Sequence, residues 1–400
     1  MQLIQRPTYL EKIIKHKDTT GIIKIITGIR RGGKSTLFKL YQNYLLNNNV
    51  LKEQIININF ESMENEDLLD YRNLYEYIKS KLLPDKMNYI FLDEIQNVSK
   101  FQRVLTSFYS MKNIDLYITG SNAYLLSGEL ATLLSGRYIQ IQVYPLSFKE
   151  YLSTFDDKSN LEEKFNRYIK YGSFPYILTY KNKEEILSYL ESIYNAIILR
   201  DVLQRSKISD VNRLKKLILF MFNNIGSLTS INNIKNQMIN DNFKIDVATI
   251  KNYLNTLTNS FILHKAPRYD IRGKELLKTN DKYYIADTGL RYFLLRNDKE
   301  DIGHILENVI YLELLRRGYK IYVGKNGTLE IDFVAIKGNK IEYYQVAHSV
   351  LSAETLEREL NGFKNIKDNY PKYLLTTDYL TQGNYDGIEC INIINWLLEE

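Results

Sequence analysis

The sequence contains very little cysteine and histidine, and this scarcity argues against two kinds of structural site. Among 400 residues there is one cysteine, Cys390, so no disulfide can form within the chain. The four histidines are scattered at positions 16, 264, 304 and 348. This spacing argues against a zinc site, which needs several Cys or His ligands close together. A reducing compartment, the cytoplasm, is therefore the expected location.

The sequence also lacks long apolar runs and a strong excess of charge. No run approaches the roughly 18–20 apolar residues that a membrane-spanning helix needs, so no membrane association is expected. Residues 1–18 interleave charged and apolar residues and show no cleavage site, which argues against a signal peptide. The 53 Lys and Arg nearly balance the 47 Asp and Glu, for a net charge of +6. This balance argues against a protein that coats a polyanion, although a local basic patch stays open.

The first 150 residues do contain a regular series of short apolar runs. Amphipathic segments such as 35–46 and 74–83 separate these runs, which cover residues 22–27, 54–60, 88–94, 114–120 and 138–143. Apolar strands that alternate with helices are typical of a parallel sheet covered on both faces. The sequence therefore predicts an α/β fold for this part of the chain.

A glycine-rich segment, "GIRRGGKST" at 28–36, follows the first apolar run and opens an amphipathic segment. It fits the spacing G-x-x-x-x-G-K-[ST], in which glycines let backbone N–H groups point at phosphate oxygens. The lysine then reaches the β- and γ-phosphates, and the hydroxyl is a Mg²⁺ ligand. The residues expected to bind the nucleotide are Gly28, Arg31, Gly32, Gly33, Lys34, Ser35 and Thr36.

Three further segments supply candidate catalytic residues. "NYIFLDEIQ" ends an apolar strand in Asp93, expected to hold Mg²⁺, and Glu94, expected to orient or deprotonate water. The alternative is an exposed acidic strand end. Asn122 in "YITGSN" is expected to contact the γ-phosphate or the water, or else caps a turn or helix. Arg137 in "LLSGRYIQ" is either an arginine finger that completes a neighbouring subunit's site or a partner of nearby carboxylates.

Several motifs in combination resemble a family of predicted AAA+-type P-loop ATPases of bacteria and archaea. They are "GIRRGGKST", "IFLDEIQ", "ITGSN", "LLSGR", "YPLSFKEYL" and "YGSFP". Members of that family join this ATPase to a C-terminal domain of unknown function. The resemblance implies ATP and Mg²⁺ as cofactors, an additional-strand P-loop fold, a helical lid and a winged helix. By the same resemblance, Walker A, Walker B and sensor-1 roles fall to Lys34, Ser35, Asp93, Glu94 and Asn122.

After residue 150 the pattern becomes mainly helical. Segments 161–172 and 183–206 have helical period, and Gly172 is expected to end the first. Arg200 either faces the nucleotide from this lid or forms a salt bridge on the helix surface with Asp201 or Glu191.

Residues 211–296 are predicted to form helix, helix, helix, two strands and a short helix, the order of a winged-helix module. Ser230 and Asp246 are the expected N-caps of the second and third helices, and strands are expected near 261–268 and 281–286. DNA contact and a packing role stay open for this module. Its candidate contacts are Lys251, Asn252 and Asn255 on the third helix and Lys265, Arg268, Arg272, Lys274 and Lys278 in or near the wing.

From Glu307 onward the predicted order is helix, strand, strand, helix, strand, helix. "EIDFVAIKGNKIEYYQVAHS" at 330–349 predicts a hairpin turning at "KGN", with Glu330 and Asp332 on one strand face. Glu307, Asp332 and Gln345 resemble the acid and amide positions of a PD-(D/E)XK nuclease core, and this resemblance implies a second Mg²⁺ site. Ala347 stands where that core has its lysine. A nuclease-like fold without cleavage is therefore favoured over a true nuclease, and over a plain salt bridge of Asp332.

These expectations divide the chain into a P-loop ATPase domain (1–155), a helical lid (156–209), a winged-helix domain (210–300) and a small nuclease-like α/β domain (301–400). The expected function is a Mg²⁺-dependent ATPase coupled to an inactive nuclease-like recognition domain. The alternatives are an ATP-gated DNA nuclease and a nucleotide-dependent switch or scaffold with little turnover. DNA or another nucleic acid, a protein partner and a homo-oligomer all stay open.

Overall fold

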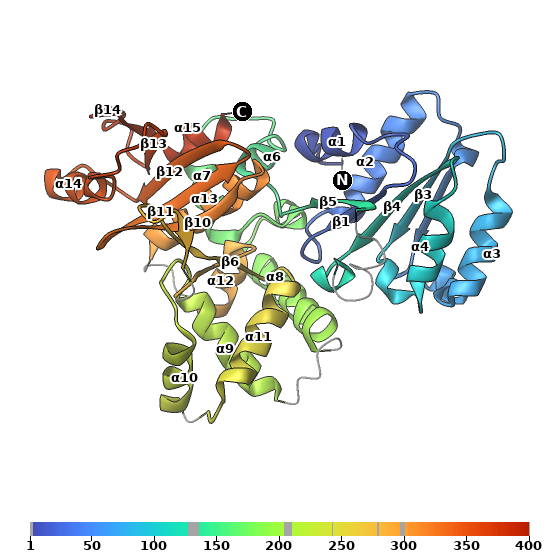
Figure 1. Ribbon diagram of the computed structural model, residues 1–400, viewed down its shortest axis with the longest axis horizontal. Helices are drawn as coiled ribbons and strands as arrows, with labels where there is room; N and C mark the ends of the chain where they lie inside the picture. The colour runs from blue at the N-terminus through green and yellow to red at the C-terminus, as the bar shows by residue number, and fades with distance from the viewer. Residues whose placement is uncertain are drawn as a thin grey trace. The chain divides into compact units, whose positions relative to one another are not determined.

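The computed structural model describes residues 3–126, 136–203, 210–241, 243–277, 280–296 and 301–399 (Figure 1). The chain divides into two compact units. The first consists of Met1–Pro145 with Asn259–Phe261, and the second of Leu146–Thr258 with Ile262–Glu400. Among the described helices, none is long and apolar enough to span a membrane.

A five-stranded parallel sheet forms the centre of the first unit. Its strands are β1 (Ile23–Thr27), β2 (Ile55–Asn59), β3 (Asn88–Asp93), β4 (Ile114–Gly120) and β5 (Tyr138–Gln142), in the order β2-β3-β4-β1-β5. Each strand falls in one of the five apolar runs, so the predicted parallel sheet is confirmed. Strand β4 lies between β1 and β3, which is the additional-strand arrangement of P-loop proteins.

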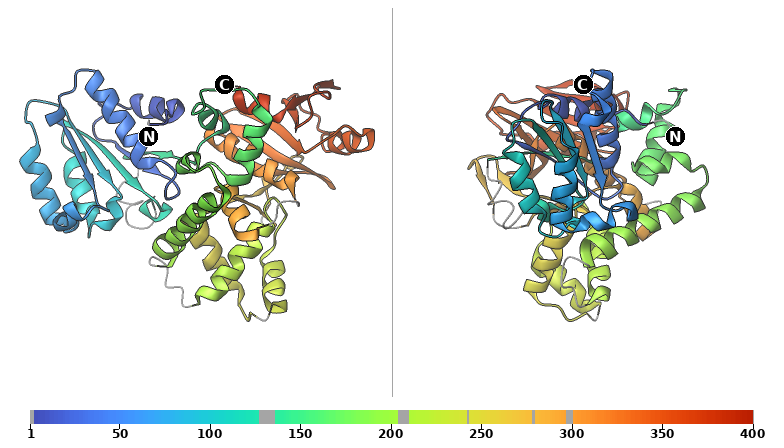
Figure 2. Two further views of the ribbon diagram at one scale, coloured as in Figure 1. Left: turned by 180° about the vertical axis from the view of Figure 1, so that it is seen from behind. Right: turned by 90° about the vertical axis from the view of Figure 1, so that its right-hand side faces the viewer.

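Helices cover both faces of this sheet (Figure 2). They are α1 (Pro7–Ile14), α2 (Lys34–Asn47), α3 (Tyr71–Lys81) and α4 (Phe101–Tyr109). Leu74 of α3 and Leu105 of α4 are buried in one cluster with strand residues such as Leu92. On α2, Phe38 packs edge-on against Phe91 of β3, with ring centroids 5.0 Å apart. Burial on two faces explains why the central strands β1, β3 and β4 are rich in apolar residues.

The second unit begins with helices: α6 (Phe148–Leu152), α7 (Leu161–Tyr171), α8 (Lys183–Ala196), α9 (Val211–Asn223), α10 (Ile231–Asn240) and α11 (Val247–Asn259). Gly172 ends α7 at a φ of +84°, as predicted. The predicted caps are also present, since Ser230 accepts the N–H of Asn233 and Asp246 accepts that of Thr249. Helix α8 continues as a π-helical turn over Ile197–Leu203.

Strands β6 (Leu263–Ala266) and β9 (Lys282–Ile285) pair antiparallel, and α12 (Thr288–Leu295) follows. The order of three helices, two strands and a short helix matches the prediction. The segment between those strands differs from it, because this segment forms β7 (Arg268–Asp270) and β8 (Glu275–Leu276). Strand β7 runs parallel beside β10 of a larger sheet. Such short strands have no readable period, so the sequence showed only a basic loop.

That larger sheet is mixed and has eight strands, in the order β14-β15-β13-β12-β11-β10-β7-β8. The remaining strands of this sheet and the helices between them are α13 (Ile302–Arg316), β10 (Lys320–Asn326), β11 (Leu329–Lys337), β12 (Lys340–Ala347), α14 (Ala353–Asn361), β13 (Lys372–Thr376), β14 (Gly383–Tyr385), β15 (Ile388–Asn392) and α15 (Ile393–Leu398). Strands β11 and β12 are the predicted hairpin, and Gly338 turns between them at a φ of +59°. The sequence-based order missed strands such as β10 and β14.

Candidate nucleotide site

The glycine-rich loop connects β1 to α2 at the carboxyl edge of the parallel sheet. Gly28 has a φ of +146°, and a Cβ atom there would lie 2.0 Å from the carbonyl oxygen of Val143. Gly33, the N-cap of α2, has a φ of +104°. Only glycine fits the first position, because a side chain would collide with backbone that cannot move aside. The loop therefore ends at the N-terminus of α2, where its backbone N–H groups and the positive end of the helix dipole can together bind an anion.

Lys34, the first residue of α2, directs its ammonium back across this loop. Its Nζ donates to the carbonyl oxygens of Gly28 (3.0 Å) and Ile29 (3.3 Å) and to Oγ of Ser121 (2.9 Å). The same Nζ lies 3.4 Å from Oε1 of Glu94. The side chain is almost fully buried. An anionic phosphate oxygen is a stronger acceptor than a carbonyl, so it can take over these contacts.

Asp93 is the last residue of β3 and is buried beside the loop. Its carboxylate accepts a hydrogen bond from the hydroxyl of Thr119. Burial raises the pKa of Asp93, and the hydroxyls of Ser35 and Thr119 oppose that rise. Ser35 and Asp93, the two predicted Mg²⁺ ligands, thus lie near each other.

Glu94 has a backbone φ of +56°, which is unusual for a residue with a side chain. Its Oε1 accepts a hydrogen bond of 2.6 Å from Oγ of Ser121, and its Oε2 accepts one from Nε2 of Gln96. Burial alone would raise the pKa of this carboxyl, but the Lys34 ammonium and the two hydrogen bonds lower it to about 2. Glu94 is therefore ionised at neutral pH and able to accept a proton.

Ser121 is a site residue that the sequence did not single out. It follows β4 and contacts both Lys34 and Glu94. Asn122, the residue predicted for this position, is buried at the same edge, and its carbonyl oxygen accepts the N–H of Leu125. The motif "ITGSN" offers two adjacent polar side chains, and only the structure shows which one reaches the lysine.

Two arginines near the loop were also missed. The buried guanidinium of Arg30 pairs with Glu61, which follows β2 at the same sheet edge. Its positive charge is one of the influences that lower the pKa of Glu94. Arg6, only 1% exposed, donates from Nη1 to the carbonyl oxygen of Gly32 and from Nη2 to that of Tyr144, both at 2.9 Å. Arg6 thus fixes the backbone of the loop through its hydrogen bond to Gly32. Arg31, which was predicted to bind the nucleotide, is exposed.

Arg137 lies at the opposite edge of the sheet from the loop. It directly precedes β5, whose Tyr138 pairs with Ile23 at the start of β1, whereas the loop follows the end of β1. A five-residue strand spans roughly 17 Å. The guanidinium stands over the ring of Tyr109, 5.1 Å from its centroid. Arg137 therefore does not complete the site of its own chain, and a role in a neighbouring subunit stays a prediction.

The residues of the predicted second metal site lie around a lysine. Nζ of Lys282, on β9, is 2.9 Å from Oε1 of Glu330, 3.4 Å from Oε2 of Glu307 and 3.5 Å from Oδ1 of Asp332. Burial and the nearby Glu307 raise the pKa of Asp332 to about 7. Within the ranges that the structure describes, no group of three or more His, Cys, Asp or Glu side chains is arranged to hold a metal ion.

The predicted nucleic-acid contacts are only partly free of other contacts. On α11, Lys251, Asn252 and Asn255 are exposed, as their polar positions predict. Lys265 instead pairs with Asp281 at 2.8 Å, and Nε of Arg272 donates to Asn326 at 3.1 Å. The remaining residues are Arg268, which is partly buried, Lys274, which is exposed, and Lys278, which lies outside the described residues. Arg200, the predicted lid arginine, is exposed.

Comparison with known proteins places the chain in a family. Residues 20–152 match a protein family described as "AAA domain", and residues 162–301 match "Domain of unknown function (DUF8612)". The chain is 42% identical over 403 residues to an "Uncharacterized protein" of Haemophilus influenzae, and the match covers 99% of each. The chain belongs to the same family as this protein. "Uncharacterized protein MJ1544" of Methanocaldococcus jannaschii is 31% identical over 386 residues, covering 92% of this chain and 84% of that protein.

A solved structure shows the same fold. The Walker-type ATPase PABY2304 of Pyrococcus abyssi matches with a TM-score of 0.51 and 14% identity, covering 73% of this chain and 96% of that one. The resemblance to AAA ATPases is thus confirmed in its coarse form, because residues 20–152 match an AAA domain and the solved structure has the same fold. An AAA domain implies ATP binding. The specific role of the second unit is not shown by these matches.

The side chains of the AAA domain also fit Mg²⁺ together with ATP. Gly28 leaves space where a side chain would collide, Lys34 supplies a buried positive charge, and the hydroxyl of Ser35 lies close enough to Asp93 to lower the pKa of that carboxyl. Oxygen ligands of this kind are those that Mg²⁺ prefers.

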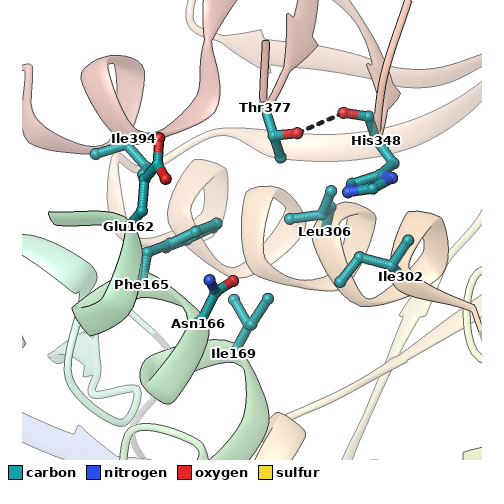
Figure 3. A pocket seen from close by; sticks show the side chains of 9 residues that line it. All are labelled: Glu162, Phe165, Asn166, Ile169, Ile302, Leu306, His348, Thr377 and Ile394. Carbon is teal, nitrogen blue, oxygen red and sulfur yellow. Dashed lines mark hydrogen bonds between the residues drawn. The ribbon is translucent and has the colours of Figure 1, made fainter. Parts of the chain in front are cut away.

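The second unit contains a small pocket between α7, α13 and the ends of β12 and β13 (Figure 3). Its volume is about 220 Å³, and its lining includes Phe165, Leu306 and His348. The carbonyl oxygen of His348 accepts a hydrogen bond of 2.7 Å from the hydroxyl of Thr377 at the rim. The volume is below the roughly 300–1,000 Å³ typical of ligand sites, so we assign it no ligand.

Proposed function

We propose that the chain is a Mg²⁺-dependent ATPase whose AAA domain couples ATP hydrolysis to a nuclease-like C-terminal domain that recognises a partner without cleaving it. The observation that carries the enzymatic part is the pair Asp93–Glu94. A buried, ionised Glu94 directly follows the proposed metal ligand and lies 3.4 Å from the ammonium of Lys34. A protein that only binds nucleotide needs no such base.

Each residue of the proposed site has a distinct role. The N–H groups of the loop and of the first turn of α2 bind phosphate oxygens, and Lys34 neutralises charge on the terminal phosphate. Ser35 and Asp93 would hold Mg²⁺, which spreads the negative charge of the phosphates when bound. Arg30 brings a further positive charge close to this edge.

Glu94 orients and deprotonates the attacking water. Both of its carboxylate oxygens accept hydrogen bonds from protein donors, Ser121 and Gln96. Ser121 also accepts a hydrogen bond from Lys34. When Lys34 turns toward a phosphate, the hydrogen bond from Ser121 still holds the Glu94 carboxylate in place. Each carboxylate oxygen has a second lone pair, which can accept a hydrogen bond from the attacking water.

The second unit supplies the coupling elements in this proposal. Helices α7 and α8 act as the lid, and α9 to α11 with β6 and β9 act as the winged helix; their order along the chain supports this assignment. The hairpin β11–β12 carries Asp332 and Gln345 at the positions expected for a nuclease-like core. The partner is open between a nucleic acid and a protein.

A nucleotide-dependent switch with rare turnover is the second candidate. The observation that favours it is that both oxygens of the Glu94 carboxylate already accept hydrogen bonds from protein donors, which compete with the attacking water. Multiple-turnover ATPase rates with and without DNA separate the candidates. Acceleration by DNA supports a DNA-coupled ATPase, and a rate near zero under all conditions supports the switch.

The enzymatic proposal is tested by Lys34→Ala, which removes the ammonium that bridges the loop, Ser121 and Glu94. We expect loss of ATP hydrolysis with an unchanged far-UV circular dichroism spectrum. Lys39→Ala is the matched control, because Lys39 lies on the same helix but is exposed. Hydrolysis at the wild-type rate in Lys34→Ala would overturn the assignment.

A further inference from the structure

We propose that the ammonium of Lys282 is the resident cation of the acidic cluster in the second unit, in the place that a divalent metal occupies in a nuclease of similar fold. This inference rests on the nuclease-like part of the proposed function and is independent of ATP hydrolysis. It explains why the hairpin at 330–349 can dispense with a lysine at position 347.

The ammonium is surrounded by carboxylates on separate elements. Glu307 comes from α13, and Glu330 and Asp332 come from β11, and each has an oxygen within 3.5 Å of Nζ. An ammonium has three N–H donors, so one lysine can serve three carboxylates. A catalytic lysine that assists a metal-bound water stands to one side of the acids. Lys282 instead contacts all three of them.

Other atoms that would coordinate a metal are already engaged. Oδ2 of Asp332 accepts the N–H of Val346 at 2.9 Å. Oε1 of Gln345, the predicted amide ligand, accepts the N–H of Asp332 at 3.2 Å, and its Nε2 donates to Glu359 at 2.9 Å. These contacts fix the hairpin and engage one oxygen of Asp332 and the amide of Gln345. With the ammonium of Lys282 among the acids, the residues present therefore do not fit the metal that the fold resemblance implies.

Burial favours a cation at this point. Lys282, Glu307 and Asp332 are each less than 8% exposed. Buried carboxylates are strongly unfavourable unless a positive charge accompanies them. A lysine held by strand β9 is always present, whereas a metal ion must be drawn from solution. The hydroxyl of Tyr284, also on β9, adds a hydrogen bond of 3.2 Å to Oε2 of Glu307.

The consequence is a domain without metal-activated water. The nucleophile of a metal-dependent nuclease is water bound to the ion. With Lys282 in the ion's place, that water is absent, and the cluster instead ties β9 to α13 and β11.

Removal of the ammonium tests the proposal directly. We expect Lys282→Met, in the full chain without nucleotide, to bind one more Mn²⁺ than the wild type in an electron paramagnetic resonance titration. Addition of Asp332→Asn to Lys282→Met should abolish the gain. Lys265→Met is the matched control, because Lys265 pairs with the single carboxylate of Asp281 and should expose no metal site. A folded Lys282→Met chain without an additional Mn²⁺ would overturn the proposal.

The wild type provides a second measurement that does not depend on the stability of Lys282→Met. The Mn²⁺ stoichiometries of wild type and Asp332→Asn should be equal, and neither should nick plasmid DNA. Mn²⁺ binding or nicking that Asp332→Asn abolishes would refute the resident-cation assignment. ATP hydrolysis measured on the same samples reports separately on the AAA domain, so failure of one proposal is distinguishable from failure of the other.

Discussion

Replacement of Ser121 by alanine tests the part of the nucleotide site that only the structure reveals. The change removes the 2.6 Å hydrogen bond to Glu94 and the 2.9 Å hydrogen bond from Lys34 without adding bulk. Both lost partners are charged. A hydrogen bond to a charged group contributes about 1.5–3 kcal/mol. If one such contribution is needed in the transition state, the rate of hydrolysis falls by about 10- to 150-fold.

The pH dependence distinguishes this role from a general loss of structure. The hydrogen bond from Ser121 is one of the influences that lower the pKa of Glu94 to about 2. Without it the pKa of Glu94 rises, so hydrolysis in Ser121→Ala should begin to fail at a higher pH than in the wild type. Steady-state phosphate release between pH 4 and 8 measures the rate, and the same assay extended below pH 4, where circular dichroism shows that the fold persists, measures this acid limb. Asn122→Ala and the exposed Ser110→Ala serve as controls. A wild-type profile for Ser121→Ala beside a large loss for Asn122→Ala would refute the assignment.

Two further substitutions test the packing around these sites. Gly28→Ala places a Cβ 2.0 Å from the Val143 carbonyl oxygen, so the affinity for a fluorescent ATP analogue should fall at least about tenfold. In the control Gly21→Ala, the added Cβ meets no atom within 4 Å, and the analogue should bind as in the wild type. Burial lowers the pKa of His264 to about 4, below its ordinary 6.5. Since the unfolded chain therefore takes up the proton first, His264 favours folding above pH 6.5, and up to about 3 kcal/mol is lost as pH falls toward 4. Urea titrations should show a shallower acid loss for His264→Phe, and an unchanged slope would contradict the buried, neutral imidazole.

The sequence predicted those parts of the molecule that depend on neighbouring residues. Burial on two faces makes β1 and β3 rich in apolar residues, so their positions were readable, and so was the loop of Gly28 and Lys34 between a strand and a helix. The hairpin of β11 and β12 was also readable, because the alternation of its residues and the turn at Gly338 are local features.

Contacts between distant residues were not readable. Lys282 lies 50 positions before Asp332, and only the pairing of β6 with β9 and the packing of α13 bring it to the acids. Arg137 shows a different limit. It precedes a strand, and in a parallel sheet that places it opposite the loop that follows β1. The sequence left its role open between an arginine finger and a partner of nearby carboxylates, because its distance from the loop depends on strand direction.

The central claim is that Glu94 activates water in a Mg²⁺-dependent ATPase site. Glu94→Gln tests it most directly, because the amide keeps the size and one carbonyl acceptor but cannot take a proton. We expect this variant to bind a fluorescent ATP analogue as tightly as the wild type while releasing phosphate at least about 100-fold more slowly. Phosphate release at the wild-type rate by Glu94→Gln would contradict the account.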